Sequence, residues 1–161
     1  MRVSVLTDPA VGDAHQDLLG LLGGEEGVTA AIEDFHHRLL ADPTLAPAFA
    51  DLDMAVLRRH HIQLLTYLLG GPGPQPTSAA GLRASHLPHR VTEAQFSAVV
   101  AHLVASLPND PRTEQIIPDI AERLNWLRPH VVYEQIQRFN DGHAGSKTDL
   151  AASQQAFPPS A

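Results

Sequence analysis

Histidines in this sequence stand where helices would place apolar side chains, and their imidazole rings are the groups best suited to hold a transition metal. The chain has 10 histidines against 11 lysines and arginines, and it has no cysteine. The lack of thiols excludes disulfides, cysteine nucleophiles, cysteine-ligated zinc or iron–sulfur sites, and thiolate ligation of haem. Any such metal would therefore be held by histidine or by oxygen.

Three of these histidines lie in three separate segments of helical periodicity. His36 shares a stripe with Ile32, because residues four apart lie on one face of a helix. His61 repeats the pattern in the next segment, and His86 follows Leu82 by one turn in a third. The three rings are therefore expected to point toward the same interior.

These positions have three interpretations. A histidine on an apolar face is often a core residue with one or two hydrogen-bond partners, and in the pairs His36-His37 and His60-His61 one member can face solvent. A zinc site would require three histidines, or histidines spaced as in HExxH, and that spacing is missing. Haem needs one axial imidazole and a flat apolar slot with aromatic walls, which this sequence can supply.

Length, charge and hydropathy narrow the class of protein. A chain of 161 residues has room for one domain, which we place at 15–139, between a flexible extension at 1–14 and a disordered tail at 140–161. The net charge of −7 argues against a nucleic-acid partner. The sequence also lacks a secretory pattern and an apolar run of roughly 20 residues, so we expect no membrane partner and a cytoplasmic location.

Helical spacing dominates the chain, and strand-like runs of Val, Ile and Thr are missing, so the expected fold class is all-α. Polar residues that can cap helices precede four of the segments: Glu25 or Thr29, Asp53, Thr92 with a capping box, and Asp110 before Pro111. The expected helices span residues 15–22, 30–40 with Glu25 or Thr29 at its opening, 54–69, 81–89, 93–107, 111–128 with a kink at Pro118, and 130–139.

Four segments in a fixed order carry a resemblance to a known family. They read LLGGEEGVTAAIEDF, RLLADPTLAPAF, DLDMAVLRRHHIQLLTYLLGGPG and LRASHLPHRVTEAQF. Together, over about residues 19–128, they resemble the truncated haemoglobins, and most closely group 1. The resemblance implies a truncated, two-over-two globin fold around haem b (iron protoporphyrin IX), with His86 as the proximal ligand of the iron and Val91, Thr92 and Phe96 at the family's offsets from it.

The resemblance also implies which side chains surround the haem. Phe49 would pack flat on the ring, and the cations of Arg58, Arg59, Arg83 and His89 are candidates to pair with the haem propionates. The residues expected to contact the cofactor are Phe35, Phe49, Leu57, His60, His61, Leu64, Leu82, Arg83, His89 and Phe96.

The departures from the family pattern fall on the distal side, across the haem from His86. The family usually has Tyr where this chain has His36, directly after Phe35, and usually has Gln at the position of Leu57 or His61. His60 stands where some members carry a histidine that binds the sixth position of iron, so His60 or His61 is a possible sixth ligand. The loop GPGPQPTSAAG, expected to border the entrance, also lacks the family's Tyr-x-Gly.

Several functions remain open at this level. The first is reversible binding of a diatomic ligand, O2 or NO, with His36 or His61 donating a hydrogen bond to it. A second is a haem enzyme: a nitric oxide dioxygenase that needs an external reductase, a peroxidase-like catalyst with His36 or His61 as catalytic base, or an oxidase of a nitrogenous substrate. A third is a redox or sensor protein with histidine on both sides of the iron.

Overall fold

The computed structural model describes residues 18–72 and 75–143, and all regular secondary structure within these ranges is helical. The all-α prediction is thus confirmed, whereas the expected extension at 1–14 and residues 144–161 of the expected tail lie outside the described residues. After a short helical stretch at 18–21, the elements are α2 (Gly24–Ala41), α3 (Ala46–Phe49), α4 (Met54–Leu68), α5 (Ala79–His86), the 3-10 turn η1 (Leu87–His89), α6 (Glu93–Ala105), α7 (Pro111–Asn125), α8 (Arg128–Val131) and α9 (Tyr133–His143).

The start of α2 is set by glycine rather than by a polar cap. Gly23 is the N-cap residue with φ 89°, Gly24 follows with φ 67°, and no side chain caps the helix. Left-handed backbone of this kind strains residues that carry a Cβ atom. The expectation that Glu25 or Thr29 opens this helix is therefore wrong; Glu25 instead places negative charge in the first turn, where the helix dipole favours it.

The other three predicted caps are confirmed. The carboxylate of Asp53 accepts from the backbone N–H of Ala55 at 3.0 Å and begins α4. Thr92 and Gln95 form the capping box of α6, each side chain accepting from the backbone N–H of the other residue. Asp110 caps α7 in the same way as Asp53 caps α4. These side chains satisfy N–H groups that have no partner inside the helix.

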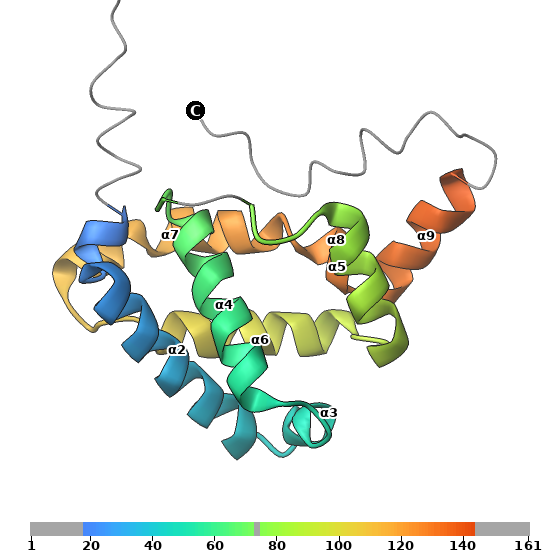
Figure 1. Cartoon of the computed structure of the whole chain (residues 1–161), viewed down its shortest axis with the longest axis horizontal. Helices are drawn as coiled ribbons and strands as arrows, with labels where there is room; N and C mark the ends of the chain where they lie inside the picture. Colours follow the sequence, from blue (N-terminus) through green and yellow to red (C-terminus); the bar gives the residue numbers. More distant parts are fainter. Residues whose placement is uncertain (1–17, 73–74, 144–161) are drawn as a thin grey trace, which may run out of the picture.

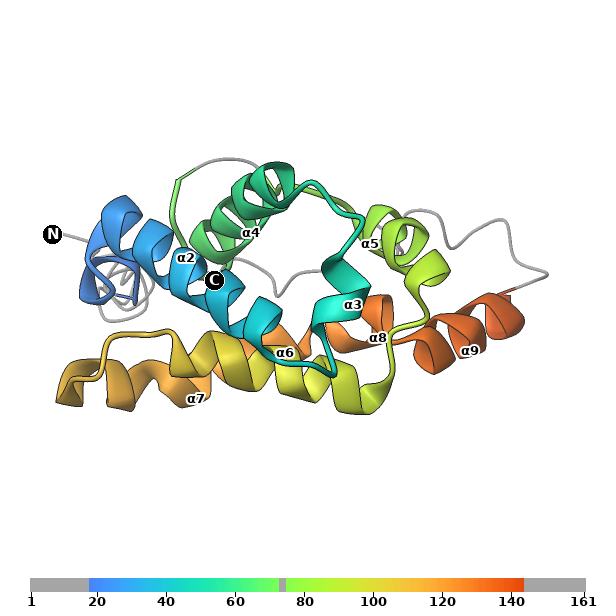
Figure 2. The same cartoon turned by 90° about the horizontal axis from the view of Figure 1, so that it is seen from below.

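The long helices form two layers. α2 packs against α4 and α6, while α6 and α4 both pack against α7. Figure 2 shows α2 and α4 in one layer and α6 and α7 in the other, and Figure 1 shows the two layers face on. The apolar faces meet in a common core that includes Ile32, Phe35, Leu39, Leu65, Leu68, Phe96, Leu103, Ile116, Ile120 and Leu124.

The C-terminal helices differ from the predicted boundaries. α7 contains Pro118 and ends at Asn125, and a separate turn, α8, then starts at Arg128. α9 continues to His143, so helix replaces the first four residues of the expected tail. Ile136 is only 1% exposed, and its burial anchors α9 to the domain. No helix within the described ranges combines the length and apolarity needed to cross a bilayer.

Candidate functional site

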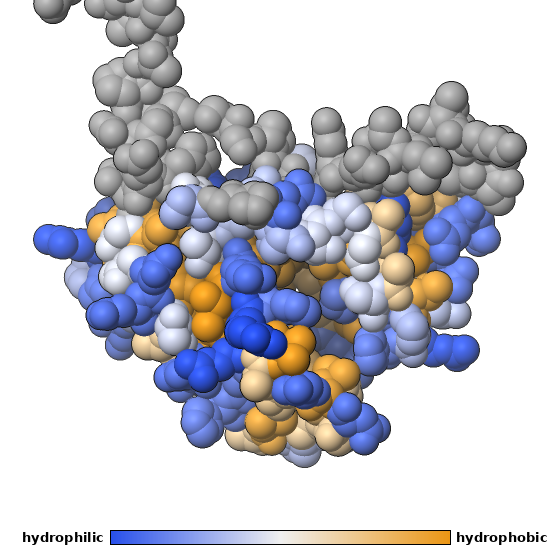
Figure 3. All heavy atoms as spheres, in the orientation of Figure 1, coloured by the Kyte–Doolittle hydropathy of each residue, from blue (hydrophilic) through white to orange (hydrophobic). Residues whose placement is uncertain are grey.

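A cavity of about 560 Å³ lies between the two layers. Its walls come from α2, α3, α4, α5, η1, α6, α7 and α8, and Figure 3 shows a hollow with apolar atoms at its bottom between α4 and α5. Ten residues of the predicted site line this cavity: Phe35, Phe49, Leu57, His60, His61, Leu64, Leu82, His86, His89 and Phe96. The sequence motifs, spread over some 60 positions, thus converge on one apolar chamber.

His86 stands at the C-terminal end of α5, and one of its two ring nitrogens is engaged in a hydrogen bond within that helix. Its Nδ1 lies 2.8 Å from the backbone carbonyl oxygen of Leu82, one turn earlier. A carbonyl can only accept, so Nδ1 carries the proton and Nε2 keeps a free lone pair. Burial lowers the pKa of His86, a shift that the Leu82 carbonyl opposes and the charge of His89 reinforces. The ring is therefore neutral at pH 7, the form in which imidazole binds a metal.

His61 and His36 form a hydrogen-bonded pair on the opposite wall. Nε2 of His36 lies 2.8 Å from Nδ1 of His61, and the two rings meet edge to face with 77° between their planes. His61, on α4, lines the cavity, whereas His36, on α2, stands behind it. The ring of Phe35 packs against both, with centroid distances of 5.7 Å and 5.6 Å.

The electrostatics of this wall keep both rings neutral. Burial and, to a lesser extent, the charges of His36, His86 and His60 together lower the pKa of His61 to about 3. Burial also lowers the pKa of His36, with a smaller contribution from the cation of Arg58. Two neutral imidazoles share one hydrogen bond, so one ring donates an N–H and the other accepts it.

His60 and His89 stand at the rim of the cavity. Both line it, and both are exposed. On α4, His60 precedes His61, and successive residues of a helix point about 100° apart, which accounts for the inward position of one ring and the outward position of the other. Pro76 and Thr77, from the loop expected at the entrance, also line the cavity.

Three arginines were expected near the haem propionates, and their present partners lie elsewhere or in solvent. Arg58 pairs with Glu33 at the surface, and Arg59 is exposed. Arg83 is only 7% exposed, and its Nη1 donates to Nδ1 of His130 at 2.9 Å. Its guanidinium also lies 3.8 Å from the centroid of the Phe139 ring.

None of these three arginines is among the residues that line the cavity. The expectation that Arg83 contacts the cofactor is not supported by this geometry, since its long side chain extends toward α8 and α9 instead. The sequence pattern could not show this direction, because Arg83 and His130 are 47 positions apart.

Several wall residues were missed by the sequence analysis. Gln63, Thr77 and Gln95 bring polar atoms to the wall, and apolar residues of the lower layer form its floor, namely Val99, Val100, Leu103, Leu124, Leu127 and Val131. The apolar periodicity of residues 93–107 and 111–128 was the signal available for the floor. It identified a core face but not the part of that face that borders a cavity.

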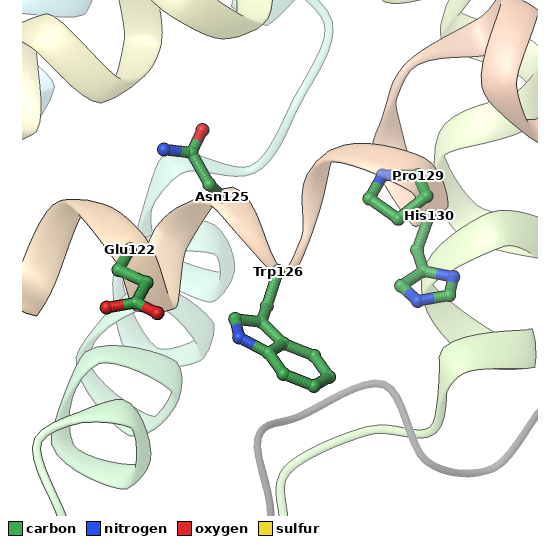
Figure 4. Close-up of a pocket in the computed structure, with 5 residues that line it drawn as sticks. All are labelled: Glu122, Asn125, Trp126, Pro129 and His130. Carbon is green, nitrogen blue, oxygen red and sulfur yellow. The ribbon is translucent and has the colours of Figure 1, made fainter.

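A second depression, of about 450 Å³, lies on the outer surface of α7 and α8. Figure 4 shows the indole of Trp126 between the side chains of Glu122 and His130, and Trp126 is 42% exposed. None of the predicted site residues lines it. Within the described part of the chain, no cluster of three or more His, Asp or Glu side chains could hold a metal ion by itself.

Comparison with known proteins points to the same family as the sequence motifs. A family model described as bacterial-like globin matches residues 17–133. The group 1 truncated hemoglobin LI410 of Chlamydomonas moewusii is 38% identical over 93 residues, which cover 56% of this chain and 53% of that protein. The group 1 truncated hemoglobin GlbN of Synechocystis is 33% identical over 104 residues, covering 62% of this chain and 82% of that protein.

Solved structures of truncated hemoglobins have the same fold as this chain. The Fe(III) form of truncated hemoglobin from Tetrahymena pyriformis superposes with a TM-score of 0.65 at 26% identity, covering 71% of this chain and 97% of that one. The match to the Chlamydomonas protein spans only about half of that relative's length. The two-layered arrangement of α2, α4, α6 and α7 is thus the arrangement that solved relatives also have.

Proposed function

This chain belongs to the bacterial-like globins and is a truncated haemoglobin closest to group 1, and from that membership we propose that it binds haem b in the central cavity, with His86 as the ligand of the iron and with O2 or NO as the small ligand on the opposite side. The observation that carries the proposal is the fixed tautomer of His86. Its Nδ1–H donates to the Leu82 carbonyl, and this leaves the lone pair of Nε2 available to a metal.

The donor set and the cavity fit this cofactor. Histidines that bind metals nearly always donate their second ring N–H to a carbonyl or carboxylate, which orients the ring and increases its basicity. His86 has this second interaction, and the wall around it is mostly apolar, with Phe49 and Phe96 among its residues. When bound, haem supplies an iron with an open axial position for a small ligand.

The side chains opposite His86 would hold that ligand. If His36 donates its Nε2–H to Nδ1 of His61, the proton of His61 lies on Nε2, on the side of the cavity. That N–H can donate to a partly negative oxygen of the ligand, and in apolar surroundings such a bond is stronger than in water. Phe35 and Leu64 line the same cavity, and their apolar side chains would keep water away from the ligand.

Two of the alternative functions are less well supported by the side chains. A peroxidase-like base should have a pKa near the working pH, and burial lowers the pKa of His61 to about 3. His60, one of the two proposed sixth ligands, is exposed at the rim. His61, the other, has no lone pair on Nε2 for iron when His36 donates to its Nδ1. Gas binding with an open sixth position is therefore the function that we put forward.

Visible absorption of the purified protein with added haem tests this proposal. We expect a Soret band, and a shift of that band when carbon monoxide is added to the reduced protein. His86→Ala should lose the haem or its proximal spectral signature, whereas His89→Ala, which changes another histidine of the cavity, should keep both. The proposal is refuted if no Soret band develops, or if His86→Ala retains the wild-type signature. Sharp, split α and β bands before any gas is added would instead favour a bis-histidine protein.

A further inference from the structure

The histidine pair connects the cavity with solvent. His61 lines the cavity, and His36 behind it is 8% exposed. No buried side-chain nitrogen or oxygen among the described residues lacks a hydrogen-bond partner, and within those residues the only hydrogen bond of His36 is through its Nε2. Nδ1 of His36 is therefore reached by solvent. Four ring nitrogens thus lie in sequence from solvent to the cavity.

The pair has two neutral arrangements that use the same contact. In one, His61 donates from Nδ1 to His36, so that the cavity meets a bare Nε2, which can accept a proton. In the other, His36 donates from Nε2 to His61, so that the cavity meets an Nε2–H, which can donate. The two arrangements differ only in the positions of protons, and the 2.8 Å separation of the rings suits both.

We propose that His36 and His61 form a proton relay through which the cavity takes small weak acids, such as hydrogen cyanide or hydrogen sulfide, and holds them as anions. The proposal rests on the proposed function, since haem iron is the group that would retain the anion. It assigns to His36, which lies outside the cavity wall, the role of passing a proton from His61 to solvent.

Atoms and charge balance in this transfer. The neutral acid HX gives its proton to the bare Nε2 of His61, His61 passes the proton of its Nδ1 to Nε2 of His36, and His36 releases the proton of its Nδ1 to solvent. The cavity then holds X⁻, solvent holds H⁺, and both rings are again neutral. Nε2 of His61 now carries a proton and donates to X⁻, so the arrangement that remains is the one that stabilises an anion.

The surrounding charges favour transfer through the pair over storage of a proton on it. Outside the pair itself, the charges that lower the two pKa values are that of Arg58, which acts on His36, and those of His86 and His60, which act on His61. All three are cations when charged, so they oppose a positive charge on the two rings, and burial opposes it too. A proton accepted by His61 is therefore passed on rather than kept, which a single buried imidazole could not do.

The test compares one protonated and one unprotonated ligand. The probes are cyanide added to the ferric haem-loaded protein at pH 7, where it is mainly HCN, and carbon monoxide added to the reduced protein. His36→Gln keeps a hydrogen-bond partner for His61 but has no second ring nitrogen to pass a proton. We expect this variant to bind cyanide at least about tenfold more slowly, a modest part of the general acid–base range, with its carbon monoxide association unchanged.

His37→Gln is the matched control, because His37 is the exposed neighbour of His36 on α2, and it should behave as wild type with both probes. In D2O, cyanide association should slow in wild type and not in His36→Gln. Equal slowing of both probes in His36→Gln would show a structural effect and overturn the relay, as would unchanged cyanide association.

Nitrogen NMR of the protein without haem separates this proposal from the previous one. Because the relay requires the two tautomers to exchange, the NMR chemical shifts of the His61 ring nitrogens should lie between the values of a protonated and an unprotonated nitrogen. One fixed tautomer of His61, unchanged on binding cyanide to the loaded protein, would overturn the relay even if haem binds. Failure to bind haem would refute the proposed function while leaving this NMR result interpretable.

Discussion

Nε2 of His36 and Nδ1 of His61 lie 2.8 Å apart across the interface of α2 and α4. The two residues are 25 positions apart in the sequence, and their bond places two polar rings in a core that is otherwise mostly apolar. Burying such rings is costly unless they satisfy each other. The pair therefore belongs to the packing of the upper layer as well as to the site, and its variants affect both.

Replacing the ring on the cavity side should weaken the retention of oxygen. In His61→Leu, the proposed N–H donor to bound O2 is lost. A typical hydrogen bond contributes about 1 kcal/mol, so O2 should dissociate roughly fivefold faster. Stopped-flow displacement of O2 by carbon monoxide measures this rate. An unchanged rate would mean that His61 does not contact the ligand.

The lowered pKa of His61 predicts the direction of one pH effect. Below pH 6.5 the unfolded chain takes up a proton on His61 that the folded chain refuses until the pH nears about 3. The free energy of unfolding should therefore fall as the pH falls through this window, by about 1.4 kcal/mol per pH unit for this residue.

Urea unfolding of the haem-free protein at pH 7, 6 and 5 checks this pH effect. In His61→Leu, the free energy of unfolding should depend less steeply on pH, because only the contributions of the other histidines remain. Equal slopes in the two proteins would show that His61 is not protected from protonation in the folded state.

The contact between Arg83 and Phe139 should stabilise the position of α9 on α5. The guanidinium lies 3.8 Å from the ring centroid and is almost fully buried, conditions under which such an interaction contributes up to about 2 kcal/mol. Phe139→Leu keeps an apolar side chain but removes the aromatic face, so unfolding in urea should require about 1–2 kcal/mol less.

Arg138→Ala is the control for Phe139→Leu. It removes an exposed ion pair with Glu134 at 3.9 Å, and exposed pairs of this kind contribute little to stability. Were Arg138→Ala to cost as much as Phe139→Leu, the contact with Arg83 would not be what fixes α9.

Gly27 should not tolerate a side chain. A Cβ atom built on it would lie 1.5 Å from the carbonyl oxygen of Leu22, which is backbone and cannot rotate away. Alanine normally stabilises a helix relative to glycine, so a loss of stability in Gly27→Ala would indicate the steric clash. Gly27→Ala should lower the free energy of unfolding by about 1–3 kcal/mol. Gly20→Ala, where a Cβ meets nothing within 4 Å, serves as the comparison, and a stabilising Gly27→Ala would contradict the geometry of this turn.

Features that depend on neighbouring residues were predictable from the sequence. The caps at Asp53, Thr92 and Asp110 act within three positions, so their residue types and spacing are enough. The same holds for His86 and the Leu82 carbonyl, because the helix itself brings them together. Periodicity therefore identified the helices and their core faces.

Features that depend on distant residues were not predictable in the same way. Whether His36 faces His61 is decided by how α2 crosses α4, and neither helix encodes the crossing alone. Arg83 could extend either to the cavity or to α8 with the same helical phase, because its side chain is long and flexible. The start of α2 was not predictable from cap residues, because a left-handed glycine stands where a polar cap would.

Because His36, His61 and His86 are neutral, they contribute dipoles but no net charge to the cavity and its surroundings. Mobile ions screen exposed charges strongly and buried groups much less, so added salt should leave the affinity for a neutral gas almost constant. The orientation of a single imidazole N–H, by contrast, reverses the sign of the local potential that a ligand meets. If the proposed relay operates, the cavity would distinguish ligands by the direction of this N–H dipole, which salt outside the protein scarcely alters.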